Sequence, residues 1–501
     1  MTNPLYDALL GGHAANNATF LQTDDGEVVS FASFVGLVAQ TANALVSAGV
    51  TPGARVVVQA PKLKQILALY GATLQAGAVY LPLNTAYTAD EMSYFIADAT
   101  PSVIICEGAA VDGLQAVSKQ VGARILTLDA DGSGTLVEAV QASSAVFETV
   151  PRKPDDLAAL LYTSGTTGRS KGAMLTHRNI LSNARVLKKS WQITERDRLI
   201  HALPIFHTHG LFVAVNTALL SGACVRFLEK FDLDAITSEM PQSTLMMGVP
   251  TFYTRLLNDA RFTKSMCASM RLFTSGSAPL LAETHLEFEE RTGHRILERY
   301  GMTETNMNTS NPYEGERRAG TVGFALPGVD VRITEPGRGE IVAEGKIGMI
   351  EVRGENVFAG YWNMPDKTAE ELRTDGFFIT GDLGRMDAEG YLHIVGRQKD
   401  LIISGGYNIY PKEIEDVLND VQGVQEAAVF GVPHADFGEA VVAAIVPEAG
   451  AQPTLAVLED RVGAKLARFK HPRRYDMVEE LPRNTMGKVQ KNLLRANFGG
   501  E

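Results

Sequence analysis

The sequence has only three cysteines in 501 residues, and they lie far apart, at positions 106, 224 and 267. This spacing provides neither a disulfide framework nor the closely spaced ligands of a zinc site. No stretch approaches the run of about eighteen apolar residues that a membrane span needs. The first residues, MTNPLYDALL, lack the basic and then apolar order of a signal peptide. These absences predict a protein of the reducing cytoplasm that has no membrane partner.

Positive charge is also in deficit, with 46 Lys and Arg against 58 Asp and Glu and a net charge of −12 at pH 7. Nucleic-acid-binding proteins usually have a basic surface, so we expect no nucleic acid partner. The segment from Arg461 onward differs, because it contains ten Lys or Arg and four Asp or Glu. This basic end is either a solvated face of a small domain or a surface that approaches a polyanion.

The length and the hydrophobic pattern predict more than one domain. Apolar bursts such as RVVVQA (55–60) and SVIICE (102–107) alternate with helical patterns such as FVGLVAQTANALVSAG (34–49). This alternation is typical of an α/β fold with helix-covered parallel sheets. Shorter strand-like pieces begin near Gly348. We therefore expect a large N-terminal domain (1–398) that includes a small β-rich subdomain, followed by a small α+β domain (399–501).

A polar loop reads YTSGTTGRSKG from Tyr162 to Gly172. Its glycines allow backbone N–H groups to turn toward an anion, its hydroxyls add donors, and Lys171 supplies a positive charge. The Walker spacing is absent, because the residue five positions after Gly165 is Ser170 and not glycine. The loop is thus either a phosphate-binding loop of another kind or a polar turn before a helix that begins near His177.

Four further motifs follow in order: YGMTET (300–305), TGDLG (380–384), GRQKDLIISGGYNIYPKEIE (396–415) and PRNTMGKVQK (482–491). With these motifs the whole chain resembles the adenylate-forming superfamily of acyl-CoA synthetases, adenylation domains and luciferases. One departure is Ser170, where the superfamily usually has proline. The resemblance implies that a carboxylate attacks the α-phosphate of ATP to give an acyl-AMP, and that a thiol such as coenzyme A then displaces AMP.

The resemblance also implies the roles of individual residues. Lys488 would be the catalytic lysine, Thr303 would contact the α-phosphate, and Glu304 would hold Mg²⁺. Lys399 falls at the hinge about which the C-terminal domain would rotate between the two half-reactions. The other nucleotide and coenzyme A contacts implied are Thr163, Ser164, Gly165, Thr166, Thr167, Gly168, Lys171, Ser277, Ala278, Pro279, Tyr300, Asp382, Arg397, Gly405 and Gly406.

Four basic residues near the C-terminus are weaker candidates for contacts with the phosphates of coenzyme A: Arg468, Lys470, Arg473 and Arg474. Lys488 is also the residue that a lysine acyltransferase would modify in some relatives, and acylation would remove the charge that the first half-reaction needs.

The acid pocket is marked by Arg299 in ERYGMTE, where relatives that take bulky acids have glycine. A buried guanidinium requires an anionic partner and can grip a carboxylate with two hydrogen bonds, so a small dicarboxylic acid is predicted. The alternative is that Arg299 faces solvent or pairs with Glu298 or another acid. His207 and His209 are expected to orient the reacting carboxylate. Arg255 and Met307 are the further substrate candidates.

The stretch ERYGMTETNMNTSNP (298–312) is similar to the malonyl-CoA synthetases of the superfamily, which implies malonate and possible tolerance of methylmalonate. Three alternatives stay open: a ligase for another small acid, an enzyme that loads a separate carrier protein, and a non-catalytic nucleotide-binding protein. Luciferase-like oxidation is disfavoured, because an arginine in the pocket suits a bulky acid badly.

Overall fold

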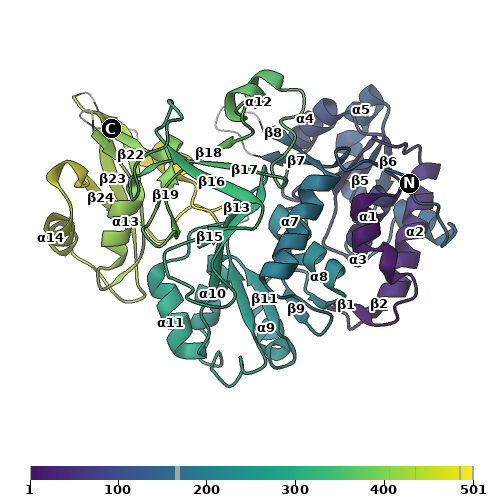
Figure 1. Cartoon of the computed structure of the whole chain (residues 1–501), viewed down its shortest axis with the longest axis horizontal. Helices are drawn as coiled ribbons and strands as arrows, with labels where there is room; N and C mark the ends of the chain where they lie inside the picture. The colour runs from purple at the N-terminus through teal and green to yellow at the C-terminus, as the bar shows by residue number, and fades with distance from the viewer. Residues whose placement is uncertain (1, 164–169, 405–406, 435, 485–486, 499–501) are drawn as a thin grey trace.

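A computed structural model of the chain describes residues 2–163, 170–404, 407–434, 436–484 and 487–498. Two large sheets lie in the first 325 residues, a smaller antiparallel sheet follows, and a fourth sheet ends the chain. The N-terminal elements lie at the right of Figure 1 and the C-terminal elements at its left. The expected class, helix-covered parallel sheets followed by β-rich and α+β parts, is confirmed.

The first large sheet has six strands in the order β6-β5-β3-β4-β7-β8 and is parallel except that the edge strand β8 pairs antiparallel with β7. Its strands are β3 (Arg55–Gln59), β4 (Val79–Pro82), β5 (Val103–Cys106), β6 (Arg124–Thr127), β7 (Leu157–Thr163) and β8 (Lys171–Thr176). Val56 and Val58 pack into one apolar cluster and Val57 into another. Both faces of the sheet are buried, which explains the continuous apolar runs in the sequence.

The second large sheet has nine strands in the order β15-β14-β13-β12-β11-β9-β10-β1-β2. The strands from β13 to β1 are parallel, and antiparallel partners close both edges. Its strands are β1 (Thr19–Thr23), β2 (Val28–Ser30), β9 (Arg198–His201), β10 (Cys224–Phe227), β11 (Leu245–Gly248), β12 (Leu272–Ser275), β13 (Leu297–Met302), β14 (Asn306–Ser310) and β15 (Phe324–Ala325).

Helices connect the parallel strands and share one core with both sheets. A single buried cluster contains Val58 of β3, Leu69 of α3, Leu187 of α7 and Ile200 of β9. The helices of this part are α1 (Pro4–Leu9), α2 (Phe31–Ser47), α3 (Lys64–Gln75), α4 (Ala89–Ala99), α5 (Val111–Val121), α6 (Thr135–Gln141), α7 (His177–Ser190), α8 (Asn216–Ser221), α9 (Leu233–Glu239), α10 (Pro250–Leu257) and α11 (Ala282–Thr292), with a π-helix, η3 (His209–Val215). Short 3₁₀ turns are η1 (Gly11–His13), η2 (Gly108–Ala110) and η4 (Met240–Gln242).

The remaining sheets form the β-rich and C-terminal parts. The first is antiparallel, with β16 (Val329–Thr334), β17 (Gly348–Gly354), β18 (Phe378–Met386) and β19 (Leu392–Arg397), and α12 (Pro365–Glu371) lies beside it. The second has β20 (Ile402–Ser404), β21 (Tyr407–Ile409), β22 (Val424–His434), β23 (Gly438–Pro447) and β24 (Arg474–Met477), with α13 (Pro411–Asn419), α14 (Leu455–Lys465), α15 (Lys491–Phe498), η5 (Gln398–Asp400) and η6 (Arg468–Lys470). The domain boundary at residues 398 and 399 and the mobility of the C-terminal domain stay predictions.

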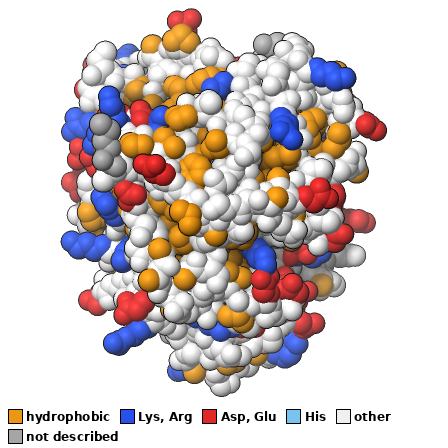
Figure 2. All heavy atoms as spheres, turned by 90° about the vertical axis from the view of Figure 1, so that its right-hand side faces the viewer, with side chains coloured by type: hydrophobic (Ala, Val, Ile, Leu, Met, Phe, Trp, Pro, Cys, Tyr) orange, Lys and Arg blue, Asp and Glu red, His pale blue; other side chains and the backbone are white. Residues whose placement is uncertain are grey.

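The surface at the right-hand end of the molecule is mixed in character. Figure 2 shows hydrophobic side chains across the middle of this face, with Lys, Arg, Asp and Glu spread mainly around its margin. Among the described residues, no helix combines the length and the apolar character required to cross a membrane.

The aromatic packing beneath α11 gives a test of the core. Phe288 is fully buried and contacts the rings of Tyr253, Phe262 and Phe273. Phe288→Ala should lower stability by about 3–5 kcal/mol and therefore lower the midpoint of thermal unfolding. Leu286→Ala, at a position on the same helix that is 59% exposed, should change stability by less than about 0.5 kcal/mol. Equal shifts for the two variants would contradict this packing.

Candidate active site

The predicted site residues gather at the carboxyl ends of neighbouring parallel strands. His207 and His209 follow β9, Ser277 follows β12, and Thr303 and Glu304 follow β13. These strands belong to the run β13-β12-β11-β9 of the nine-stranded sheet. Because parallel strands end at the same edge, residues that are about 100 positions apart in sequence meet there, as ligand-binding residues do in other open α/β sheets.

Arg299 lies on β13 and is buried, with 3% of its surface exposed. Its Nε and Nη2 atoms have no hydrogen-bond partner in the described part of the chain. The preceding Glu298 turns its carboxylate toward His285, where Glu298 Oε1 lies 3.7 Å from His285 Nδ1. Burial lowers the pKa of the Arg299 guanidinium to about 9. The structure thus supports neither alternative for Arg299, exposure to solvent or pairing with Glu298.

Gly276 makes room for this guanidinium. A Cβ atom at Gly276 would lie 2.3 Å from Arg299 Nη1 and 2.4 Å from Cζ, so a side chain cannot be accommodated without displacing the arginine. The next residue, Ser277, has a left-handed backbone with φ of 72°, a strained conformation that often accompanies functional sites. Ser277 Oγ lies 3.2 Å from His209 Nδ1. Ala278 is half-buried and Pro279 is exposed at the same edge.

The two histidines are neutral near pH 7. Burial, with the charges of Lys488 and Arg299, lowers the pKa of His207 to about 3. Burial and the charge of Arg299 also hold the pKa of His209 well below its usual value. His209 Nε2 is buried and has no partner among the described residues. Neutral imidazoles can donate or accept a hydrogen bond but add no positive charge.

Lys488 approaches this edge from the C-terminal domain. Burial and the charge of Arg397 lower the pKa of Lys488 to about 8, opposed by Asp382 and Glu304. The preceding Gly487 faces α10, because a Cβ atom there would lie 3.4 Å from Thr251 Oγ1. Lys488 therefore lies close enough to Arg397, Asp382 and Glu304 for their charges to act on it.

Asp382 and Arg397 form a pair beside the lysine. Arg397 Nε lies 3.0 Å from Asp382 Oδ1, and the Tyr300 hydroxyl donates to Asp382 Oδ2 at 2.6 Å. Asp382 raises the pKa of Arg397, whereas burial and Asp382 raise that of Tyr300. Lys399 is exposed, and partial desolvation and the charge of Arg397 lower its pKa. One acceptor and one donor are thus held in fixed relation, as the binding of a vicinal diol requires.

Glu304 and Lys171 meet through a tyrosine that sequence reasoning missed. The Tyr361 hydroxyl lies 3.1 Å from Glu304 Oε1 and 2.6 Å from Glu371 Oε2. Lys171 Nζ lies 3.1 Å from Glu371 Oε1 and 4.1 Å from the Tyr361 ring centroid. Burial raises the pKa of Glu304. Tyr361 and Glu371 belong to no motif. Only the fold brings them next to Lys171, at the start of β8, and Glu304, just after β13.

The remaining predicted residues have different outcomes. Met307 is buried and close to Gly301, where a Cβ atom would lie 2.6 Å from Met307 Cε. Arg255 lies on the exposed side of α10 with its guanidinium 5.4 Å from the Phe231 ring, so the structure gives no support for its predicted contact with the acid. Thr163 and Thr303 are half-buried. Ser164, Gly165, Thr166, Thr167, Gly168, Gly405 and Gly406 lie outside the described residues.

The four weaker coenzyme A candidates lie in the C-terminal domain. Lys470 is 2.7 Å from Glu413, and Arg474 is 2.8 Å from Asp476. Arg473 lies over the ring of Phe437 at 4.1 Å, and Arg468 is exposed. Two of the four thus already have carboxylate partners, which weakens the case for them as phosphate ligands.

The chain is similar in sequence and in structure to known AMP-binding enzymes. Residues 12–362 match the AMP-binding enzyme family, and residues 413–488 match the AMP-binding enzyme C-terminal domain. A malonate–CoA ligase of Arabidopsis thaliana is 36% identical, over 90% of this chain and 79% of that protein. A feruloyl-CoA synthase of an Amycolatopsis species is also 36% identical, over 95% of each chain. The crystal structure of ATP-bound MatB from Rhodopseudomonas palustris is 53% identical, with a TM-score of 0.98 over 100% of this chain and 99% of that one.

The depressed pKa of His207 provides a test of the site geometry. In histidine-labelled protein, the NMR signals of His207 should show a neutral imidazole from pH 8 down to pH 5, because its pKa is about 3. Arg299→Met removes a nearby positive charge, which favours the protonated ring, so the pKa of His207 should rise. Arg255→Met, which removes an exposed charge from α10, should leave it unchanged. A His207 that titrates near pH 6.5 in the unmodified protein would contradict this arrangement.

Proposed function

This chain belongs to the AMP-binding enzyme family, and from that premise we propose that it forms malonyl-CoA from malonate, ATP and coenzyme A through a malonyl-AMP intermediate. The relatives that it matches include CoA ligases for different acids. The family therefore supports an acid–thiol ligase, and the residues of this chain must identify the acid.

The observation that supports malonate is the buried guanidinium of Arg299, two of whose nitrogen atoms have no partner among the described residues. Leaving such a group without an anion is costly, whereas a carboxylate can accept two parallel hydrogen bonds from it. Malonate has one carboxylate to react and a second, one carbon away, to bind. Buried Met307 fills space beside Gly301 and would limit branching at the middle carbon, so methylmalonate is a secondary substrate.

In the proposed first half-reaction an oxygen of the malonate carboxylate attacks the α-phosphorus of ATP, and the bond to pyrophosphate breaks. Lys488 would neutralise charge where the two anions meet, as fixed positive groups do in phosphoryl transfer. Thr303 would donate to the α-phosphate. His207 and His209, which are neutral, would orient the carboxylate without competing with Arg299 for it.

In the proposed second half-reaction the sulfur of coenzyme A attacks the acyl carbon, and the bond to AMP breaks. The two steps need different groups at one centre, so the C-terminal domain would rotate about Lys399 and remove Lys488. Gly405 and Gly406 would then line the path of the thiol. Acylation of Lys488 by a lysine acyltransferase would stop the first step and spare the second.

The proposed reaction also assigns roles to the residues of the nucleotide site. Asp382 and Arg397 would bind the ribose hydroxyls, and Lys171 would bind the distal phosphates beside the loop at 163–168. Glu304 offers a buried carboxylate oxygen, the kind of ligand that Mg²⁺ prefers. Among the described residues, no cluster of three or more His, Cys, Asp or Glu could hold a metal by itself. Glu304 would hold the ion when it is bound, and the ion would supply positive charge next to the phosphates.

Substrate preference tests the role of Arg299. The purified enzyme should turn over malonate faster than butyrate with ATP and coenzyme A. Arg299→Met should lower kcat/KM for malonate by about 30-fold or more, since truncating one partner of a buried charge pair costs about 2–5 kcal/mol. Arg255→Met should keep the preference. Faster turnover of butyrate than of malonate by the unmodified enzyme would reject malonate, and preference for a phosphopantetheinylated carrier over free coenzyme A would indicate a carrier-loading enzyme.

The pH dependence of the first half-reaction tests the role of Lys488. Because the pKa of Lys488 is lowered to about 8, its ammonium is charged below that pH and loses its proton above it. Malonate-dependent exchange of pyrophosphate into ATP should therefore show kcat/KM falling as pH rises through about 8.

Two variants complete this test. Lys488→Met should abolish the exchange but retain thioester formation from prepared malonyl-AMP. Lys488→Arg, which keeps its charge at alkaline pH, should move the fall in any residual exchange to higher pH. Full pyrophosphate exchange by Lys488→Met would contradict the role of this lysine.

A further inference from the structure

His209 is the first residue of an unusual helix. Residues His209–Val215 form a π-helix, which is wider than an α-helix and is frequent at functional sites. Gly210 lies so close to the preceding chain that a Cβ atom would be 2.1 Å from the carbonyl oxygen of Pro204. The direction of the His209 side chain therefore depends on how the backbone at Gly210 is held.

A buried histidine holds that backbone. His201, at the end of β9, is 1% exposed, and its Nε2 lies 2.8 Å from the carbonyl oxygen of Gly210. A carbonyl oxygen can only accept, so Nε2 must carry the hydrogen. The other ring nitrogen of His201, Nδ1, must then be an acceptor, because burial and the charge of Lys62 lower the pKa of this ring to about 3 and keep it neutral.

Lys62 provides the matching donor. Its Nζ lies 3.0 Å from His201 Nδ1, 3.1 Å from the carbonyl oxygen of His201 and 2.6 Å from that of Leu228. An ammonium has three N–H donors and no acceptor, so these three contacts use all of its hydrogens. The contact with Nδ1 is compatible with a single tautomer of the neutral ring, the one with hydrogen on Nε2.

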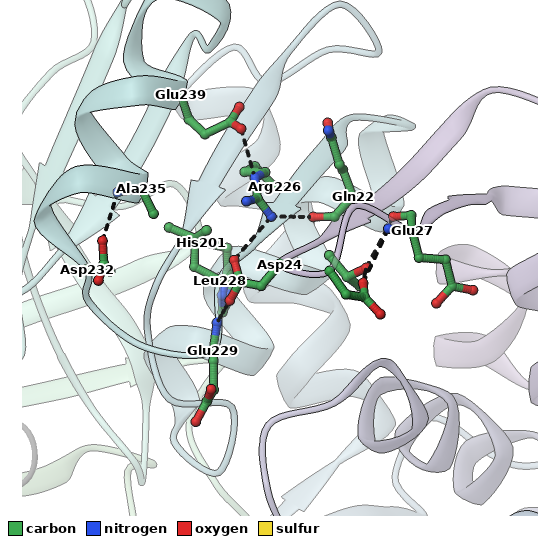
Figure 3. Close-up of polar contacts among 12 residues, drawn as sticks. Gln22, Asp24, Glu27, His201, Arg226, Leu228, Glu229, Asp232, Ala235 and Glu239 are labelled. Atoms are coloured by element: carbon green, nitrogen blue, oxygen red, sulfur yellow. Dashed lines mark hydrogen bonds and ion pairs between the residues drawn. The ribbon is translucent and has the colours of Figure 1, made fainter. Parts of the chain in front are cut away.

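The contacts of Lys62 with His201 and Leu228 also connect the two large sheets. Lys62 lies in the connection from β3 to α3, whereas His201 and Leu228 end β9 and follow β10. Figure 3 labels His201 and Leu228 together with Asp24, whose carboxylate contacts Arg226 and the backbone N–H of Glu229. Burial holds the pKa of Lys62 well below its usual value, and the charges of Asp24 and Glu229 oppose this shift.

We propose that Lys62 and His201 are positioning residues for the acid pocket: Lys62 helps to fix the tautomer of His201, and His201 fixes the start of the π-helix, so that the imidazole of His209 is held beside Ser277. Neither residue touches the reacting groups. The inference rests on the proposed function only for the identity of the acid, since the contacts from Lys62 to Gly210 exist whichever acid is used.

Replacements of His201 separate the hydrogen bond from the volume of the ring. Gln can place an amide N–H near the position of Nε2, whereas Phe keeps the volume but has no donor. His201→Phe should raise KM for the acid by about five- to tenfold, the effect of one lost hydrogen bond. KM for ATP should stay within about twofold. His201→Gln should restore most of the affinity for the acid, which a merely space-filling residue would not do.

Replacements of the lysine test the tautomer directly. In histidine-labelled protein, NMR should show His201 with hydrogen on Nε2 alone. Lys62→Met should add a population with hydrogen on Nδ1, because one of the two contacts that select the tautomer is lost while the contact with Gly210 remains. The same variant should raise KM for the acid more than KM for ATP. Lys64→Met is the matched control, because Lys64 is two residues away and pairs with Glu27 at the surface. It should leave the spectrum and both KM values unchanged.

The outcomes are distinct. Hydrogen on Nδ1 of His201 in the unmodified protein, or equal acid KM values for folded His201→Phe and His201→Gln, would overturn the proposal. If Lys62→Met does not fold, the His201 variants and the spectrum of the unmodified protein still decide it. If the enzyme uses an acid other than malonate, the proposed substrate fails, whereas the tautomer and the Gln rescue, measured with that acid, remain as expected.

Discussion

The site depends on the desolvation of one guanidinium. Arg299 has lost its water at the carboxyl edge of the nine-stranded sheet and has gained no carboxylate in exchange from the described residues. The surroundings reinforce this need for an anion: Glu298 points away, the neighbouring histidines are neutral, and Lys488 brings another positive charge to the same edge. Such an arrangement favours a ligand with more than one negative charge.

At the same edge, the carboxylates of the site contact groups other than Arg299. The carboxylates Asp382 and Glu304 each contact a tyrosine hydroxyl, and Asp382 also pairs with Arg397. They lie with Lys488 on the proposed nucleotide side, whereas Arg299 with His207 and His209 forms the proposed acid side. In the proposed reaction, this division would let a dianionic acid approach a triphosphate beside Arg299, which pairs with no carboxylate of the described residues.

Much of the fold could be predicted from the sequence, because local patterns determine its strands and helices. The apolar runs at 55–60 and 102–107 are strands with two buried faces, and α7 begins at His177 as expected. The motifs identified Arg299, which lies on β13, and the pair Asp382 and Arg397, which lie on the neighbouring strands β18 and β19 of the β-rich part. Arg255 shows the limit: it is two residues from buried Tyr253, which on a helix is a rotation of about 200°, so it faces the other way.

Other contacts had no sequence signal, because they join residues that only the fold brings together. Tyr361 reaches Glu304 from the β-rich part, and Lys62 reaches His201 from the other large sheet. The π-helix at 209–215 likewise has no signature in the composition of its residues. Such contacts hold the predicted residues in place and could be found only from the coordinates.

The most direct test of the central claim compares malonate with its monomethyl ester, which keeps the reacting carboxylate and the carbon skeleton but lacks the second charge. If the guanidinium of Arg299 binds that charge, kcat/KM for malonate should exceed that for the ester by about 30-fold or more, and the difference should largely disappear in Arg299→Met. Equal values for the two acids with the unmodified enzyme would contradict the account.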